Sequence, residues 1–288
     1  MNTIIKSIRS HLNMSQTEFA ELLGVTFATV NRWENGRAKP NKLAQTKIYD
    51  ICRERNVPLY QMVLDKIERV AAEIEVEEGH ILLYHGSKNG IDGAIALRSR
   101  EHCDFGKGFY MGTDPSQCLT LICDFPDSKL YIMSVNLNDL QSMEIPVGID
   151  WAMLVAYNRD KMQKIQGTNL YQKYSGMTKE CDLVIGCIAD DRMFFVMDSF
   201  FQGTITDAAL INSLSALNLG KQYVMVTRKG CAHTKIAAEI ELSDLERMSI
   251  QEVAVDNRNR GVSFANEICR NYRREGKYFD ELLEETEG

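Results

Sequence analysis

The sequence lacks the paired cysteines that bind zinc or form the disulfides of a small secreted domain. No Cys-x-x-Cys pair and no regular spacing occurs among its eight cysteines, which lie at positions 52, 103, 118, 123, 181, 187, 231 and 269. Disulfide frameworks and zinc modules both require such spacing. Cys118 and Cys123, with His102 and Cys103 upstream, match no zinc pattern. We therefore expect reduced, mostly buried thiols and no bound metal.

Long apolar segments are also absent. No run approaches the roughly 18 apolar residues that a membrane-spanning helix needs, and the N-terminus has no signal-peptide core. The glycines at 106 and 108 are too few and wrongly spaced for a phosphate-binding loop or a dinucleotide fingerprint. These absences predict a soluble, cytoplasmic protein with no membrane partner.

Charge is distributed unevenly along the 288 residues, a length that is comfortable for two domains. Residues 1–70 carry 11 Lys+Arg against 7 Asp+Glu, a net charge of +4. The rest of the chain carries a net charge of −11, so the overall value of −7 averages two unlike parts. This asymmetry indicates that only the first part faces nucleic acid.

The first part contains clear signals for short helices. Ser15 with Glu18 forms a capping-box pattern that begins a helix, and Gly24 ends this helix. Thr26 is placed to cap a further helix over Phe27–Glu34. Other helices are expected over residues 3–12, 42–55 and 58–72. Two short helices joined by a glycine-containing turn allow the second to lie in the DNA major groove.

These segments, Ser15–Thr26 and Val30–Gly36, resemble the Cro and lambda-repressor family of helix-turn-helix domains. The resemblance covers residues 1 to about 65 and implies binding to double-stranded DNA, with a homodimer on a palindromic site. We expect Val30 and Trp33 to belong to the core. A helical bundle that mediates protein contacts is the alternative. The candidate DNA-binding residues are Gln16, Phe27, Ala28, Asn31, Arg32, Asn35, Arg37, Lys39 and Lys42, with Arg32 expected to read a guanine edge.

Two strings in the second part suggest a different chemistry. Leu83–Ser87 reads Leu-Tyr-His-Gly-Ser, and Asp104–Tyr110 reads Asp-Phe-Gly-Lys-Gly-Phe-Tyr. With Ala189-Asp190-Asp191 and a late Gln222, they resemble ADP-ribosyltransferases over roughly residues 80–245. More narrowly, they are similar to an uncharacterised bacterial family of that superfamily. The resemblance implies NAD+ as co-substrate and a mixed α+β fold.

By this resemblance, His85 hydrogen-bonds a ribose hydroxyl and Gly86 offers its backbone to the nicotinamide amide, while Tyr110 stacks on the ring. Lys107 and Arg159 are candidate phosphate contacts. A solvent-exposed surface position explains Lys107 equally well, and solvation at a helix end explains Arg159 equally well. The residues expected to contact the cofactor are His85, Gly86, Ser87, Lys107, Gly108, Phe109, Tyr110 and Arg159.

The third catalytic position departs from the superfamily pattern. His85 and Tyr110 are the first two positions of the pattern. Gln222 falls at the third position, where the resemblance leads us to expect a glutamate. A neutral amide accepts a hydrogen bond but offers no full charge to a cationic transition state, which puts turnover rather than binding in question. Glu239 and Glu241 are competing candidates, but strand alternation favours a solvent-facing position for both.

We therefore predict an α+β protein with an all-α helix-turn-helix domain at residues 1–70 and an acidic linker at 71–79. An ADP-ribosyltransferase-like domain at 80–250 and a helical acidic tail at 251–288 follow. The expected function is a toxin-like NAD+-dependent ADP-ribosyltransferase with an unidentified macromolecular acceptor and an antitoxin partner. The alternatives are an NAD-sensing transcriptional regulator and an NAD glycohydrolase.

Overall fold

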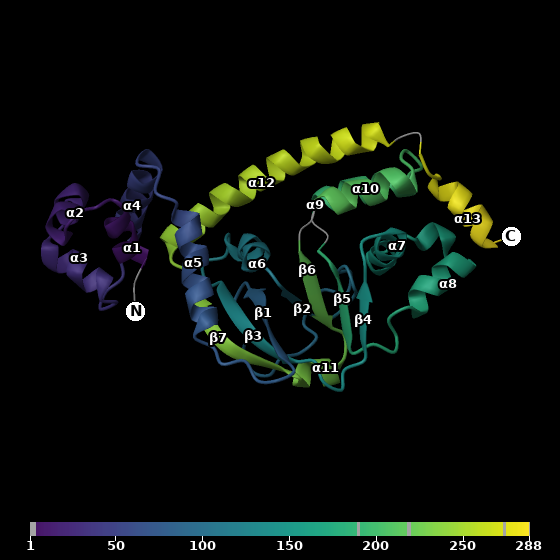
Figure 1. Cartoon of the computed structure of the whole chain (residues 1–288), viewed down its shortest axis with the longest axis horizontal. Helices are drawn as coiled ribbons and strands as arrows, with labels where there is room; N and C mark the ends of the chain where they lie inside the picture. Colours follow the sequence, from purple (N-terminus) through teal and green to yellow (C-terminus); the bar gives the residue numbers. More distant parts are fainter. Residues whose placement is uncertain (1–3, 189–190, 218–219, 273–274, 288) are drawn as a thin grey trace.

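A helical region, a mixed β-sheet and a long helix that spans both make up the chain (Figure 1). The computed structural model describes residues 4–188, 191–217, 220–272 and 275–287. Its helices are α1 (Ile4–His11), α2 (Gln16–Leu23), α3 (Phe27–Glu34), α4 (Lys42–Glu54), α5 (Leu59–Ala72), α6 (Pro115–Ile122), α7 (Ile149–Asn158), η1 (Gln163–Ile165), α8 (Asn169–Gly176), α9 (Asp191–Phe201), α10 (Asp207–Leu217), α11 (Arg228–Ala232), α12 (Asp244–Asn271) and α13 (Phe279–Glu287). Its strands are β1 (His80–Ser87), β2 (Phe109–Gly112), β3 (Lys129–Asn136), β4 (Ser142–Ile145), β5 (Leu183–Cys187), β6 (Lys221–Met225) and β7 (Thr234–Glu241).

Local capping defines the N-terminal helices. The Ser15 hydroxyl accepts from the Glu18 backbone N–H, and the Glu18 carboxylate accepts from the Ser15 backbone N–H, which confirms the capping box. Gly24 ends α2 in the left-handed conformation at a φ of 69°, where a side chain would be strained. Thr26 caps α3 as predicted. The start of α5 differs slightly from the prediction, because Pro58 precedes the helix instead of occupying its first turn.

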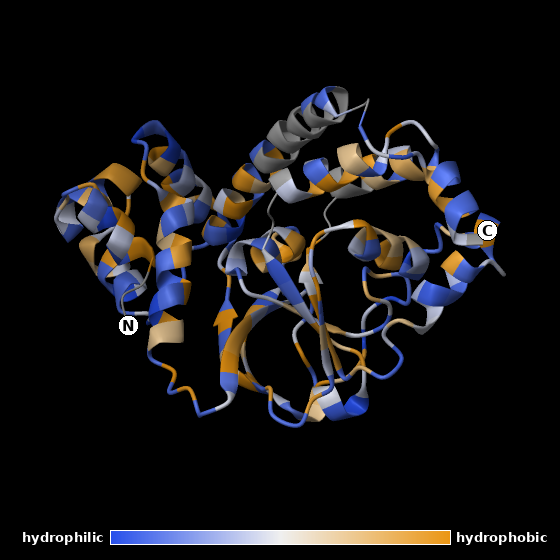
Figure 2. Cartoon of the chain, turned by 45° about the vertical axis from the view of Figure 1, so that its right-hand side comes forward, coloured by the Kyte–Doolittle hydropathy of each residue, from blue (hydrophilic) through white to orange (hydrophobic). Residues whose placement is uncertain are grey.

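Within the described residues, the sheet has seven strands in the order β4-β5-β6-β2-β1-β3-β7. The β4–β5 pair is parallel and the remaining pairs are antiparallel. The predicted α+β class is confirmed. In Figure 2, both the strands and the helices carry a mixture of apolar and polar residues.

The two faces of the sheet have separate apolar cores. On one face, the buried run from Trp151 to Ala156 in α7 packs with α8–α10 and with Val184 and Val224 of the sheet. On the other face, Leu83, Phe109 and Met111 form a smaller cluster together with the centre of β3. Leu83 and Met111 alternate with neighbours on the opposite face, as period-two strand geometry requires.

The long helix α12 joins the two regions. It arches across the molecule and contacts α4, α5, α6, α9 and α10 (Figure 1). Leu245, near its start, is 1% exposed and belongs to the core of the N-terminal helices. The Gln45 side-chain oxygen accepts from the Leu245 backbone N–H at 2.9 Å. Conversely, Val63 and Ile67 of α5 are buried against α6 and the sheet.

The predicted domain limits therefore fall at places where the two regions share structure. The limit after residue 250 lies within the continuous helix α12, and the limit after residue 70 lies within the last turn of α5. Among the described helices, none combines the length and apolar character needed to cross a bilayer.

We expect Leu245→Ala to destabilise the full chain by about 2–5 kcal/mol, because it opens a cavity between α12 and the N-terminal helices. Denaturant unfolding measures this loss. Val255→Ala on the same helix is the matched control, since Val255 is 53% exposed. Equal stability of the two variants would contradict a shared core.

Candidate functional site

The recognition-helix candidate α3 presents an open face. Phe27 is 50% exposed, and Ala28 and Arg32 are also exposed. Val30 and Trp33, on the opposite side, are buried as predicted. In Figure 1, α2 and α3 lie at the end of the molecule remote from α13. Nothing in the described part of the chain covers this face of α3.

A hydrogen-bonded network under this face fixes α2 against α3. Glu34, 4% exposed, accepts from Arg9 at 2.6 Å and from Gln16 Nε2 at 2.6 Å. Gln16 in turn accepts from Asn31, and Asn35 donates to the Asn31 backbone oxygen. Gln16 and Asn31 are thus part of the scaffold that sets the helix geometry, in addition to being candidate DNA contacts.

The basic residues after α3 are exposed, but one of them has a partner. Arg37 and Lys42 face solvent. Lys39 Nζ lies 3.0 Å from a carboxylate oxygen of Glu241 in β7. Both side chains are well exposed, so this ion pair contributes little stability and a phosphate group can replace Glu241.

In the second region, three candidate residues fall on three neighbouring strands. His85 lies on β1, Tyr110 on β2 and Gln222 on β6. Register pairs Tyr84 with Gly112 and Gly112 with Gln222. Because paired residues share a face and successive residues along a strand do not, Tyr110 and Gln222 lie on one face and His85 on the other. The structure brings together the strands but not all three side chains.

His85 is held as a neutral imidazole. Its Nδ1 lies 2.7 Å from the backbone oxygen of Tyr110, and its ring stacks on Phe109 with centroids 4.3 Å apart. Burial lowers the pKa of His85 from its usual 6.5, which outweighs the opposing effect of this hydrogen bond. Since a carbonyl only accepts, Nδ1 carries the proton and Nε2 presents a lone pair.

The Tyr110 hydroxyl is committed to the loop before β2. It donates to the Gly106 backbone oxygen at 2.7 Å and accepts from the Phe105 backbone N–H at 3.0 Å. Packing also explains the nearby glycines. A Cβ at Gly86 would lie 2.9 Å from a backbone oxygen of α6, and one at Gly108 would lie 2.5 Å from Val224. Both glycines are therefore required for the fold, whatever the site binds.

Asp104 is the central residue that the sequence did not single out as a site residue. It is 5% exposed, and its Oδ1 atom accepts from Arg159 Nε and Nη2 at 2.9 and 2.6 Å. Its Oδ2 atom accepts from Gln222 Nε2 at 2.9 Å. Arg159 thus holds a carboxylate in the described structure. In the sequence, Asp104 is marked only by its position directly before the Phe-Gly-Lys-Gly string. Its partners Arg159 and Gln222 lie far away in the sequence.

The remaining candidates lie outside this network. Lys107 is exposed and 3.7 Å from Glu101. The Ser87 hydroxyl donates to the Gly90 backbone oxygen in a turn. Glu239 and Glu241 are exposed, as strand alternation predicted, and Glu239 pairs with Lys129 at 2.5 Å. Residues 189 and 190 of the Ala-Asp-Asp string lie outside the described residues.

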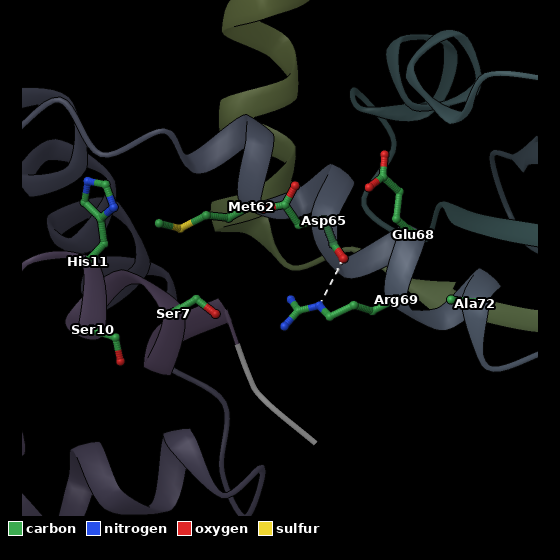
Figure 3. Close-up of a pocket in the computed structure, with 8 residues that line it drawn as sticks. All are labelled: Ser7, Ser10, His11, Met62, Asp65, Glu68, Arg69 and Ala72. Atoms are coloured by element: carbon green, nitrogen blue, oxygen red, sulfur yellow. Dashed lines mark hydrogen bonds between the residues drawn. The ribbon is translucent and has the colours of Figure 1, made fainter.

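Two surface depressions lie away from these strands. One lies between α1 and α5 and is lined by Ser7, Ser10, His11, Met62, Asp65, Glu68, Arg69 and Ala72 (Figure 3). The other lies where α4 and α5 meet α12. Within the described ranges, no group of three His, Cys, Asp or Glu side chains is arranged to hold a metal ion.

Comparison with protein families places both regions. A model described as "Helix-turn-helix" matches residues 5–43, so the N-terminal region is a helix-turn-helix DNA-binding module. A model described as "Protein of unknown function (DUF3990)" matches residues 81–235, more than half of the chain, and the chain belongs to this family. No curated protein and no solved structure shows a significant match.

For the DNA-binding module, we expect Arg32→Ala in the full chain to relax base preference at one position, at a cost of about 1–3 kcal/mol. Lys42→Ala should weaken binding to all DNA sequences alike, because a phosphate contact carries no sequence information. Selection from a random DNA pool measures both. Lys164→Ala, an exposed lysine in η1, is the control. Unchanged base preference in Arg32→Ala would contradict the assigned contact.

For His85, we expect the free energy of unfolding to fall as the pH drops below about 6.5. A lowered pKa in the folded state means that the unfolded chain binds the proton more readily, so acid favours unfolding. Denaturant unfolding at about pH 7.5 and about 5.5 measures the slope. His85→Gln should show a shallower dependence, and an identical slope would refute a half-buried neutral imidazole at this position.

Proposed function

We propose that the chain is an NAD+-dependent ADP-ribosyltransferase and that its helix-turn-helix module brings it to DNA or represses its own operon. The observation that carries the proposal is the placement of His85, Tyr110 and Gln222 on the adjacent strands β1, β2 and β6. These residues are separated by 25 and 112 positions in sequence, yet the fold brings their strands side by side.

The proposed reaction breaks the bond between the nicotinamide nitrogen and C1′ of the ribose. The bonding electron pair leaves with neutral nicotinamide, and C1′ passes through an oxocarbenium-like state. A nucleophile on the acceptor then bonds to C1′ and releases its proton to solvent. The products are nicotinamide, a proton and the ADP-ribosylated acceptor, or free ADP-ribose if water attacks.

The electrostatics of His85 fit the role that the resemblance gives it. Because Nδ1 donates to the Tyr110 carbonyl, the Nε2 lone pair is the acceptor that a ribose hydroxyl needs. On the opposite face, the Gln222 amide supplies hydrogen bonding without a formal charge. Gln222 therefore does not share the ribose contact proposed for His85, and it offers no charge that would favour fast turnover.

A second candidate function is that of a transcriptional regulator that binds NAD+ without turning it over. The shared core favours it, because Leu245 and Gln45 join the DNA-binding helices to α12 beside the sheet. Incubation with NAD+ labelled in the adenylate moiety, with cell lysate, separates the candidates. Label in protein or nucleic acid supports transfer, and label in free ADP-ribose supports hydrolysis. An NAD+-dependent change in DNA affinity with intact NAD+ supports sensing.

We expect His85→Ala to weaken NAD+ binding at least about tenfold, since it removes an acceptor to the ribose. Isothermal titration calorimetry on the full chain measures this change. His102→Ala is the matched control, because His102 is well exposed and pairs with Asp160 on the surface. Equal affinity in His85→Ala and wild type would contradict the assigned contact.

A further inference from the structure

A charged contact joins the sheet to the connection that follows the recognition helix. Lys39, between α3 and α4, places its Nζ atom 3.0 Å from Glu241 Oε2 at the end of β7. The two residues are 202 positions apart in the sequence. Lysines that flank a recognition helix are suited to DNA phosphate contacts. The Lys39 ammonium group therefore has two candidate anionic partners, a carboxylate of its own chain and a phosphate of DNA.

The end of β7 fixes the backbone of Glu241. Ile240 and Leu242, on either side of it, are buried in the core between α5 and the sheet. The Glu241 backbone oxygen also accepts from Lys66 Nζ at 3.3 Å. Lys39 lowers the pKa of Glu241, mainly through their hydrogen bond, so the carboxylate is charged at neutral pH. A negative charge on a fixed backbone therefore lies beside the DNA-binding module.

The connection that carries Lys39 is anchored to α4. The Pro40 backbone oxygen accepts from Gln45 Nε2 at 3.0 Å, and the Asn41 side chain caps α4. The side chain of Lys39 is nevertheless 87% exposed, and that of Glu241 is 64% exposed. Because neither charged group is enclosed, a phosphate oxygen has access to the Lys39 ammonium.

Glu241 has no second lysine of this kind among the described residues. Strand register places Lys129 of β3 opposite Glu241, but the Lys129 ammonium pairs with Glu239 at 2.5 Å. A phosphate that takes Lys39 therefore leaves the Glu241 carboxylate without its ion pair. The freed carboxylate then lies close to the DNA backbone, where like charges repel.

We propose that Glu241 competes with DNA phosphate for Lys39, so that the sheet weakens DNA binding by the helix-turn-helix module. The effect is graded, because an exposed ion pair is weak and is screened by salt. It corresponds to about a two- to fivefold change in the dissociation constant for DNA. By reciprocity, DNA bound at Lys39 releases the end of β7 from the module. The competition concerns DNA binding alone and does not depend on the proposed NAD+ chemistry.

Fluorescence anisotropy on the full chain tests this competition, with a duplex that wild type selects from a random pool as the probe. At about 0.1 M salt, Glu241→Gln should lower the dissociation constant about two- to fivefold. In the Lys39→Ala background the same change should have a smaller effect, because only the repulsion between Glu241 and DNA is then removed. Glu144→Gln is the matched control, since Glu144 of β4 forms an exposed pair with Lys221 and β4 lies at the opposite edge of the sheet from β7.

Three results would overturn the competition. The first is an equal effect of Glu241→Gln in both backgrounds, or no effect in either. The second is an equal gain in Glu144→Gln, because the change would then reflect net charge alone. The third is a wild-type chain that selects no duplex from the pool.

Zero-length carbodiimide cross-linking gives a second, independent readout of the contact. The reagent activates the Glu241 carboxylate, and the Lys39 amine displaces it to form an amide that mass spectrometry identifies in the digested chain. A saturating amount of the selected duplex should lower the yield of this cross-link severalfold, because phosphate then holds Lys39. The cross-link between Lys221 and Glu144 is the internal control and should keep its yield. An unchanged Lys39–Glu241 yield at saturating DNA would mean that DNA does not displace Glu241, which would also overturn the proposal.

Discussion

The buried carboxylate of Asp104 is the contact on which the candidate site depends. It connects the loop before β2 to the end of α7 through Arg159 and to β6 through Gln222. This attachment places Phe105 over Gly186, where a Cβ would lie 2.5 Å from the aromatic ring. It also brings the loop backbone to the Tyr110 hydroxyl. A neutral side chain at position 104 would leave the half-buried guanidinium of Arg159 without its carboxylate, which is costly in a low-dielectric site.

The DNA-binding module shares its core with the rest of the chain and is not joined to it by a linker alone. Leu245 of α12 completes its core, and Lys66 of α5 pairs with the 2%-exposed Glu246 at 2.8 Å. The exposed Lys39–Glu241 pair adds a weaker contact at the edge of the sheet. A shift of α12 or β7 would therefore change the contacts of the helices that face DNA. This arrangement offers a physical route between the sheet and the DNA surface under either candidate function.

Local signals predicted much of the fold. The caps at Ser15 and Thr26 depend on neighbours within three residues, so the positions of α2 and α3 followed from sequence. The apolar residues at positions 81–84 indicate a strand, although β1 extends to Ser87 and thereby includes His85 and Gly86. Strand β4 has no comparable signal, because Ser142–Ile145 is short and lies at an edge, where apolar alternation is weak.

By itself, the sequence determined the helix-turn-helix module, the α+β class and the charge asymmetry. Capping and periodicity depend on a few neighbouring residues, and composition is a sum over the sequence. Only the tertiary structure decided that His85 faces away from Tyr110 and Gln222, because strand register sets the face of each side chain. It alone also paired Asp104 with Gln222 across 118 positions, since no local signal reports which distant strand a loop will touch.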